Sequence, residues 1–176
     1  CQVVLDNYKA GRKAAEQFIA KKRLKPIFIW GVKDLSSSAE RFRGFYERFK
    51  EEGIEITPDR QVDGEYSVEY TYCKFKEIFS NLPDFDAVFA SNDLSALGFI
   101  KIAGENKKFY PRDYHIIGYD NEQFTGYLTP TLSTFQQPLR TVASISANML
   151  VDQIESKVVD DTKVVLEAKF IERNSG

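Results

Sequence analysis

Polar and aromatic side chains follow each of four short apolar runs in the sequence. They belong to Asp34 to Ser38, Glu65 and Tyr66, Ser91 to Asp93, and Tyr119 to Asn121. This set offers carboxylates, an amide, hydroxyls and an aromatic ring face, and Arg41 follows Ser37 by about one helical turn. Carboxylates and a guanidinium can each make paired hydrogen bonds, and an aromatic ring can lie against a flat apolar face. The set therefore suits a neutral polyhydroxyl ligand such as a sugar.

Structural roles compete with ligand binding at several of these positions. The type and place of Asp93 favour a helix N-cap over a ligand contact, and Ser36 to Ser38 could cap a helix in the same way. A surface salt bridge is an alternative role for Arg41, and Tyr66 could belong to the core. Residue type and spacing leave these alternatives open.

No constellation of residues indicates catalysis. The single histidine, His115, stands within an apolar run, where we expect a satisfied structural imidazole and not a catalytic base. The sequence contains no GxSxG, GxxxxGK[ST] or HExxH motif. Cys1 and Cys73 form neither a zinc spacing, nor a CxxC pair, nor a disulfide framework. We therefore predict no enzyme activity, no cofactor and no metal site.

A sheet is needed to bring the strand-end residues together. Short apolar runs alternate with segments whose apolar residues recur at helical spacing, and this alternation is typical of βαβ units. We predict an α/β fold with a doubly wound parallel sheet and helices on both faces, in which ligands bind at the carboxyl ends of the strands. The predicted strands are Ile27–Trp30, Gln61–Asp63, Ala87–Ala90 and His115–Gly118.

The pattern changes after Asp120. A strand is expected at Leu132–Phe135, a helix after Pro138, and a last strand near Val164–Ile171. This stretch could leave the sheet and return to it.

The composition limits the partners. Lysine and arginine number 24 against 26 acidic residues among 176, a net charge of −2, so the segment has no basic surplus for DNA or an anionic membrane. With 43% hydrophobic and 28% charged residues, it fits a soluble globular domain. The only methionine is Met149 and the chain opens within an apolar strand, which we interpret as a piece of a longer protein. Two cysteines without a framework favour the cytoplasm.

A series of short motifs in a fixed order resembles the LacI/GalR family of bacterial transcriptional repressors from end to end. The motifs are Leu5-Asp6-Asn7 with Gly11, Ala39 to Phe45, Asp63 to Ser67, Ala90 to Gly98, Ile117 to Asn121, Tyr127 to Thr134, Gln137-Pro138 and Ile171 to Ser175. The resemblance implies a regulator with an N-terminal helix-turn-helix DNA-binding domain, absent from this chain, and a two-lobed effector domain shaped like periplasmic sugar-binding proteins.

The resemblance also implies a division of this chain between two lobes. Residues 1–137 would belong to the C-terminal lobe, 138–160 would form a helix of the N-terminal lobe, and 161–176 would return to the C-terminal lobe.

By the same resemblance, the effector contacts are Ser37, Arg41, Tyr66, Asn92 and Asp120. Arg41 and Asp120 would hold hydroxyls, Tyr66 would stack on the ligand, and Asn92 would both donate and accept. The effector would be a sugar or a sugar phosphate. Leu35 stands where purine-responsive members carry a cation, which argues against a purine.

The family pairs subunits through the helices that start here near Ser67 and Asp93, so a homodimer is expected. Its interface residues would be Leu94, Leu97, Phe99 and Ile100, although a fully internal role for all four is the alternative. Operator DNA would be bound only through the missing domain. A solute-binding protein of an ABC sugar importer and an enzyme on the same scaffold are the alternative functions.

Overall fold

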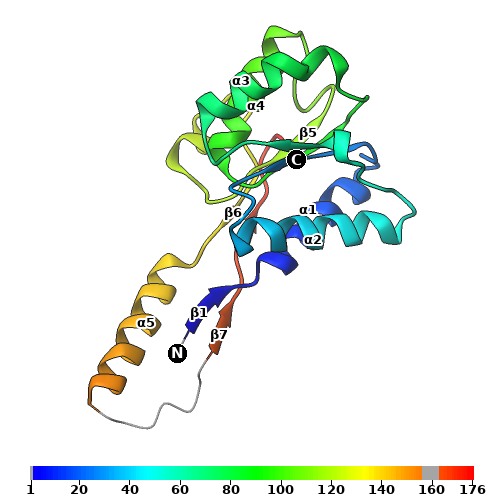
Figure 1. Cartoon of the computed structure of the whole chain (residues 1–176). Coiled ribbons are helices and arrows are strands. Elements are labelled where there is room, and N and C mark those ends of the chain that lie inside the picture. Colours follow the sequence, from blue (N-terminus) through cyan, green and yellow to red (C-terminus); the bar gives the residue numbers. More distant parts are fainter. Residues whose placement is uncertain (1, 156–162) are drawn as a thin grey trace.

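The chain folds around a four-stranded parallel sheet, which confirms the predicted α/β fold. The computed structural model describes residues 2–155 and 163–176. The strands lie in the order β3–β2–β4–β5 and all pair in parallel. Figure 1 shows the whole chain, coloured along the sequence. The four strands are β2 (Pro26–Trp30), β3 (Gln61–Asp63), β4 (Ala87–Ala90) and β5 (His115–Ile117). Each lies within one residue of the predicted strand.

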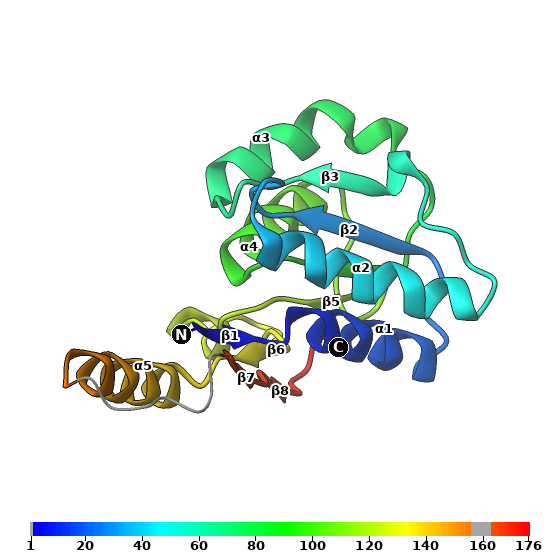
Figure 2. The same ribbon diagram turned by 60° about the horizontal axis from the view of Figure 1, so that its bottom comes forward.

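Helices cover both faces of this sheet. On one face lie α1 (Asn7–Ala20) and α2 (Ser36–Glu51), and on the other lie α3 (Val68–Ile78) and α4 (Asp93–Glu105) (Figure 2). Alternate strand residues point to opposite faces, so Phe28 packs with α1 and α2 whereas Ile29 packs with α3 and α4. Two separate apolar cores result, one on each side of the sheet.

Two glycines let α1 and α2 approach each other closely. A Cβ atom on Gly11 would stand 2.0 Å from the carbonyl oxygen of Arg41, and one on Gly44 would stand 2.0 Å from the carbonyl oxygen of Tyr8. Only hydrogen fits at either position. This contact fixes the start of α2, and with it Arg41, against the start of α1.

The helix N-caps differ from the predictions. Asn92, not Asp93, caps α4, because its Oδ1 accepts the Ser95 backbone N–H at 2.9 Å. The α2 helix already begins at Ser36, and its N-cap, Leu35, provides no side-chain hydrogen bond. Ser38 instead accepts the Gly31 N–H at 3.0 Å and so supports the end of β2.

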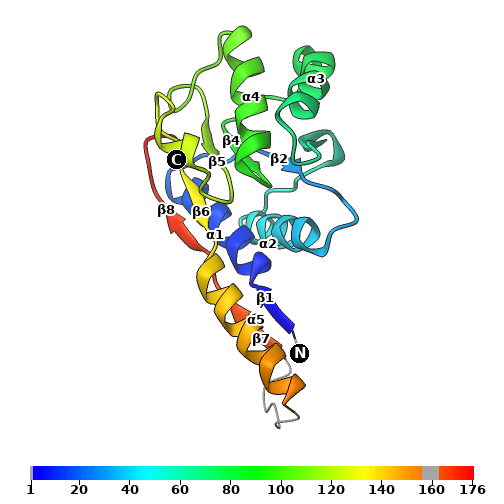
Figure 3. The same cartoon turned by 90° about the vertical axis from the view of Figure 1, so that its left-hand side faces the viewer.

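A second group of elements lies beside the main sheet. It contains β1 (Gln2–Leu5), paired in parallel with β7 (Lys163–Leu166), and α5 (Leu139–Ile154), which contacts β1 (Figure 3). The short antiparallel pair of β6 (Thr134–Gln136) and β8 (Lys169–Ile171) lies between this group and the main sheet. The single last strand predicted near Val164–Ile171 is thus two strands, and the strand predicted at Leu132–Phe135 begins two residues later.

The β1–β7–α5 group has little core of its own. None of the described residues of α5 is buried, and Leu139, Leu150 and Ile154 are exposed. The pairing of β1 with β7 sets residues 2–5 and 163–166 apart from the four-stranded sheet. Within the described ranges, no helix is both long enough and apolar enough to cross a membrane.

Phe99 does not lie at the surface. Its side chain is fully buried against Phe75, Phe85 and Tyr114 in the core between α4 and the sheet. The prediction that Phe99 belongs to a subunit interface is therefore wrong. Leu94 is exposed, and Leu97 and Ile100 are half-buried.

Candidate functional site

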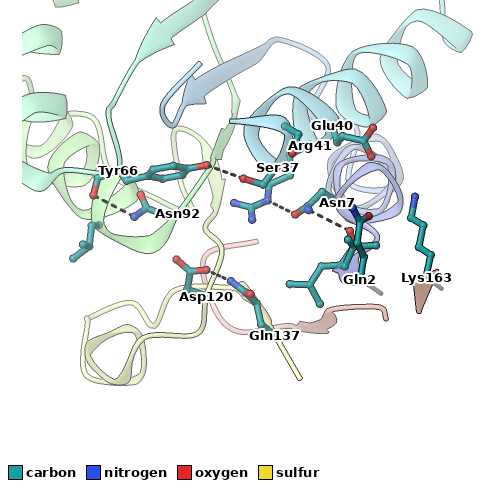
Figure 4. Close-up of a pocket in the computed structure, with 14 residues that line it drawn as sticks. Gln2, Asn7, Ser37, Glu40, Arg41, Tyr66, Asn92, Asp120, Gln137 and Lys163 are labelled. Carbon is teal, nitrogen blue, oxygen red and sulfur yellow. Dashed lines mark hydrogen bonds between the residues drawn. The ribbon is translucent and has the colours of Figure 1, made fainter. Parts of the chain in front are cut away.

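All five predicted effector contacts line one cavity at the carboxyl ends of the parallel strands. Its volume is about 810 Å³, and it extends from the loops after β3, β4 and β5 to the β1–β7 pair (Figure 4). The five are Ser37, Arg41, Tyr66, Asn92 and Asp120. The strand-end argument thus located the residues that share this cleft.

Arg41 is held in place by contacts on several sides. Its Nε donates to Asn7 Oδ1 at 2.9 Å, and an Nη atom donates to the carbonyl oxygen of Ser91. The guanidinium lies 3.5 Å from the centre of the Tyr119 ring, a stacked cation–π contact. With only 5% of the residue exposed, the surface salt bridge considered for Arg41 is ruled out. The guanidinium is pre-positioned at the cavity wall.

Tyr66 lies against the backbone of Gly31. A Cβ atom on Gly31 would stand 2.0 Å from Cζ of the ring, so a side chain at position 31 would displace the tyrosine. Glu65 and Tyr66 both have positive φ, 51° and 55°, and this sharp turn directs the ring over the end of β2. The Tyr66 hydroxyl lies 3.5 Å from Ser37 Oγ. Tyr66 is half-buried and lines the cavity, so it is not a core residue.

The Asn92 side chain already makes two hydrogen bonds within the protein. While its Oδ1 caps α4, its Nδ2 donates to the carbonyl oxygen of Tyr66 at 3.3 Å. The amide therefore ties the Tyr66 turn to the start of α4. It keeps one N–H and one lone pair for a ligand.

Asp93, next to Asn92, is buried beneath the cleft and binds two of the segments that form it. The residue is fully buried, its Oδ1 accepts from Thr134 Oγ1 at 2.7 Å, and its Oδ2 accepts the Glu122 N–H at 2.8 Å. Burial raises the pKa of this carboxyl from 3.8 to about 7, although both hydrogen bonds act in the opposite direction. Asp93 joins the loop after β5 to β6.

Asp120 occupies a strained turn and faces the cavity. Its φ is 111°, a value rare outside glycine, and its N–H donates to the carbonyl oxygen of Phe135 at 2.9 Å. Gln137 Nε2 donates to Asp120 Oδ1 at 2.5 Å. Burial raises the pKa of the Asp120 carboxyl, while the Gln137 hydrogen bond and the charge of Arg41 oppose the rise.

Three residues that the site-residue prediction missed shape the cleft: Asn7, Tyr119 and Gln137. Tyr119 stands among the strand-end residues, but its sequence position gives no sign that Arg41 stacks on it. Asn7 and Gln137 stand next to β1 and β6, the strands that lie off the main sheet, so the strand-end rule does not reach them. The motifs Leu5-Asp6-Asn7 and Gln137-Pro138 were the only available signal.

His115 opens β5, at the opposite end of the strand from the Asp120 turn, and differs from its prediction. Its Nδ1 is buried without a hydrogen-bond partner in the part of the chain that the structure describes, so the imidazole is not satisfied. Burial and the nearby charges of Arg23 and Lys21 lower the pKa of His115 to about 4. No group of three or more potential metal ligands occurs among residues 2–155 and 163–176.

Comparisons with known proteins agree with this arrangement. The model of the periplasmic binding protein-like domain matches residues 15–176. The HTH-type transcriptional regulator MalR of Clostridium butyricum is 31% identical over 174 residues, covering 98% of this chain and 51% of that protein. The HTH-type transcriptional repressor PurR of Serratia proteamaculans is 31% identical over 173 residues, with the same coverage.

A solved complex of the transcriptional regulator CelR with cellobiose superimposes with a TM-score of 0.92 at 27% identity. It aligns with 99% of this chain, which covers 53% of the CelR chain. The chain spans about half the length of the curated relatives it matches. It belongs to the periplasmic binding protein-like family, and these relatives are transcriptional regulators.

Proposed function

We propose that this chain is the ligand-sensing and dimerising part of a LacI-type transcriptional repressor, and that a sugar or sugar phosphate is its effector. Effector binding in the cleft would control operator binding by an N-terminal helix-turn-helix domain of the intact protein. We place the intact protein in the cytoplasm and assign it no enzyme activity. The similarity to MalR, PurR and CelR supports this class of function.

The convergence of Arg41, Tyr66, Asn92 and Asp120 on one cavity carries the proposal. A buried guanidinium and a carboxylate can each bind adjacent hydroxyls, and the Tyr66 ring offers an apolar face for a sugar ring. The similarity to CelR, whose structure was solved as a complex with cellobiose, supports a saccharide as the ligand.

Two lobes would close over this ligand. We keep residues 138–160 in the N-terminal lobe, and the pairing of β1 with β7 leads us to add residues 2–5 and 163–166 to that lobe. Residues 156–160 and 161–162 of the predicted division lie outside the described residues. The exposed apolar residues of α5 would be covered by the remainder of the lobe.

Dimerisation would use the outer surface of α3 and α4. Tyr70 is exposed there, and Leu97 and Ile100 are half-buried, so an apolar surface remains after the core has formed. Leu94, at the start of α4, is exposed and also lines the effector cavity. A two-fold axis would place the same patch on both subunits. The net charge of −2 leads us to expect no DNA binding by the 176 residues alone.

Thermal unfolding of the intact protein in the presence of defined compounds tests the effector class. The compounds are glucose, ribose, maltose, cellobiose, glucose 6-phosphate and, as a purine, hypoxanthine. A ligand at a hundred times its Kd stabilises the folded state by about 2.7 kcal/mol, which raises Tm by a few degrees. We expect at least one saccharide to raise Tm, no shift with hypoxanthine, and a clearly smaller shift in Asp120→Ala.

Two results would contradict the proposal. One is the absence of a shift with every saccharide and phosphate ester. The other is a saccharide-dependent shift of equal size in wild type and Asp120→Ala, which would place the ligand elsewhere.

A further inference from the structure

Gln137 reaches back into the cleft from the segment that leaves it. The residue lies between the end of β6 at Gln136 and the start of α5 at Leu139, where the chain passes toward the β1–β7–α5 group. Its side chain nevertheless lines the cavity and points at Asp120 (Figure 4). The amide Nε2 lies 2.5 Å from Asp120 Oδ1.

The Asp120 turn is held by the same segment through its backbone. The Asp120 N–H donates to the carbonyl oxygen of Phe135, and the Asn121 N–H donates to Thr134 Oγ1 at 3.2 Å. Two consecutive residues, Asp120 and Asn121, have positive φ, 111° and 57°. A turn of this kind persists only where its surroundings determine it, and here they do so through three hydrogen bonds from one stretch of chain.

Charges of both signs surround the Asp120 carboxylate. Arg41 on α2 attracts it, whereas Glu122 in the same loop repels it, and burial disfavours its charged form. Gln137 is the neutral donor that satisfies Oδ1 in this setting. A hydrogen bond to the charged form of an acid favours that form.

The Arg41 side chain, on the other side of the cleft, is bound by a side-chain amide as Asp120 is. Arg41 donates to Asn7, the first residue of α1, which Asp6 alone separates from the end of β1. Asn7 therefore stands where the chain first passes from the β1–β7–α5 group to the main sheet. Arg41 and Asp120 are thus each bound by a side-chain amide from a segment that joins the two groups of elements.

We propose that Gln137 is a positioning residue of the effector site, which keeps Asp120 ionised and aimed into the cavity and links it to the segment that leads to α5. The effector role of Asp120 rests on the proposed function above. The contact itself does not, because it forms within the chain without a ligand.

A pH titration of the Asp120 carboxyl tests the proposal without any ligand. In the intact protein with ¹³C-labelled aspartate, NMR would follow the Asp120 carboxyl carbon, assigned by its loss in Asp120→Asn. Gln137→Met keeps the length of the side chain but removes the donor, so we expect the midpoint to rise by about one pH unit. Gln137→Lys restores a donor with a positive charge, so its midpoint should fall below that of wild type.

The matched control is Gln136→Met. Gln136 is the exposed neighbour of Gln137, and its substitution should leave the midpoint of Asp120 unchanged. An unchanged midpoint in Gln137→Met, or an equal rise in the control, would overturn the proposal. The proposal would be supported if the midpoint of Asp120 is lowest in Gln137→Lys, intermediate in wild type and highest in Gln137→Met. A general loss of structure would not shift the midpoint in opposite directions in the two variants.

The saccharide series then separates this inference from the proposed function. Suppose that the midpoint moves as expected and that a saccharide binds. As the pH is lowered, Gln137→Met should then lose affinity for the saccharide at a higher pH than wild type does. If the midpoint moves but no saccharide binds, the proposed function fails while the positioning of Asp120 by Gln137 stands.

Discussion

Asp93 makes the stability of the fold depend on pH in a direction opposite to that of an ordinary surface carboxylate. The side chain is fully buried, and its pKa rises from 3.8 to about 7 in the folded state. Between these values the folded chain holds a proton that the unfolded chain has released, so the free energy of unfolding decreases as the pH rises through the window. About three pH units at about 1.4 kcal/mol each set an upper limit of about 4 kcal/mol on the loss.

The substitution Asp93→Asn isolates this contribution. Its amide oxygen can accept the Glu122 N–H, and its amide nitrogen can donate to Thr134 Oγ1, so both contacts of Asp93 are retained in an uncharged form. The variant should gain stability relative to wild type as the pH rises from about 4 to about 7 and hold that gain at higher pH.

Only the difference in the free energy of unfolding between Asp93→Asn and wild type is informative, because His115 changes stability with pH in the opposite direction. Its pKa is lowered to about 4, so the unfolded chain binds the additional proton between pH 4 and 6.5 and stability increases with pH there. This contribution cancels in the difference between Asp93→Asn and wild type. Urea unfolding followed by circular dichroism at a series of pH values gives both curves. Parallel curves, with no divergence between pH 4 and 7, would refute the assignment of a raised pKa to Asp93.

Three further predictions concern the cleft, the sheet and the interface. Asp120→Ala should weaken effector binding about ten- to a hundredfold, since a hydrogen bond to a charged group contributes about 1.5–3 kcal/mol, and calorimetric titration of the intact protein measures it; an affinity equal to wild type would remove Asp120 from the site. His115→Gln should remove the contribution of His115, which increases stability between pH 4 and 6.5, so the stability difference between this variant and wild type should change with pH in the direction opposite to that for Asp93→Asn. Leu97→Asp should dissociate the dimer of the intact protein by placing unpaired charges in the interface, so that analytical ultracentrifugation finds a monomer with wild-type circular dichroism; an unfolded variant or a folded dimer would reject this interface.

The main sheet was predictable because its strands are short, apolar and flanked by strong signals. Gly31 follows Trp30, and Asn81-Leu82-Pro83 ends the helical segment before Ala87–Ala90. Because both faces of the sheet are buried, each strand is a continuous apolar run. The spacing of its apolar residues and its short length together identify it as a strand. The strand-end rule then selected Asn92 and Asp120 without any knowledge of side-chain geometry.

The crossover region was harder to predict because its strands pair over long sequence distances. β1 pairs with a strand about 160 residues later, and β7 and β8 are separated only by Glu167 and Ala168. No local signal divides a run such as Lys163 to Ile171 into strands of two different sheets. The partners of Asn7 and Gln137 depend on this topology, so their contacts with Arg41 and Asp120 could not be read from the sequence.

The predictions of the helix N-cap residues were wrong for a different reason. Asn92 and Asp93 are both good N-cap residues, and propensity alone does not rank neighbours. The choice follows from tertiary structure, because Thr134 and the Glu122 N–H occupy the Asp93 carboxylate. The serine run at the start of α2, Ser36 to Ser38, was equally ambiguous, and Ser38 Oγ accepts the Gly31 N–H instead of capping the helix.

A crystal structure of the intact protein grown with the saccharide that most raises its Tm would test the central claim most directly. The account predicts sugar hydroxyls within hydrogen-bond distance of Arg41 and Asp120, and the sugar ring against Tyr66. Density for the saccharide at any other place, with Arg41 and Asp120 still bound to Asn7, Ser91 and Gln137 and out of contact with the sugar, would contradict it.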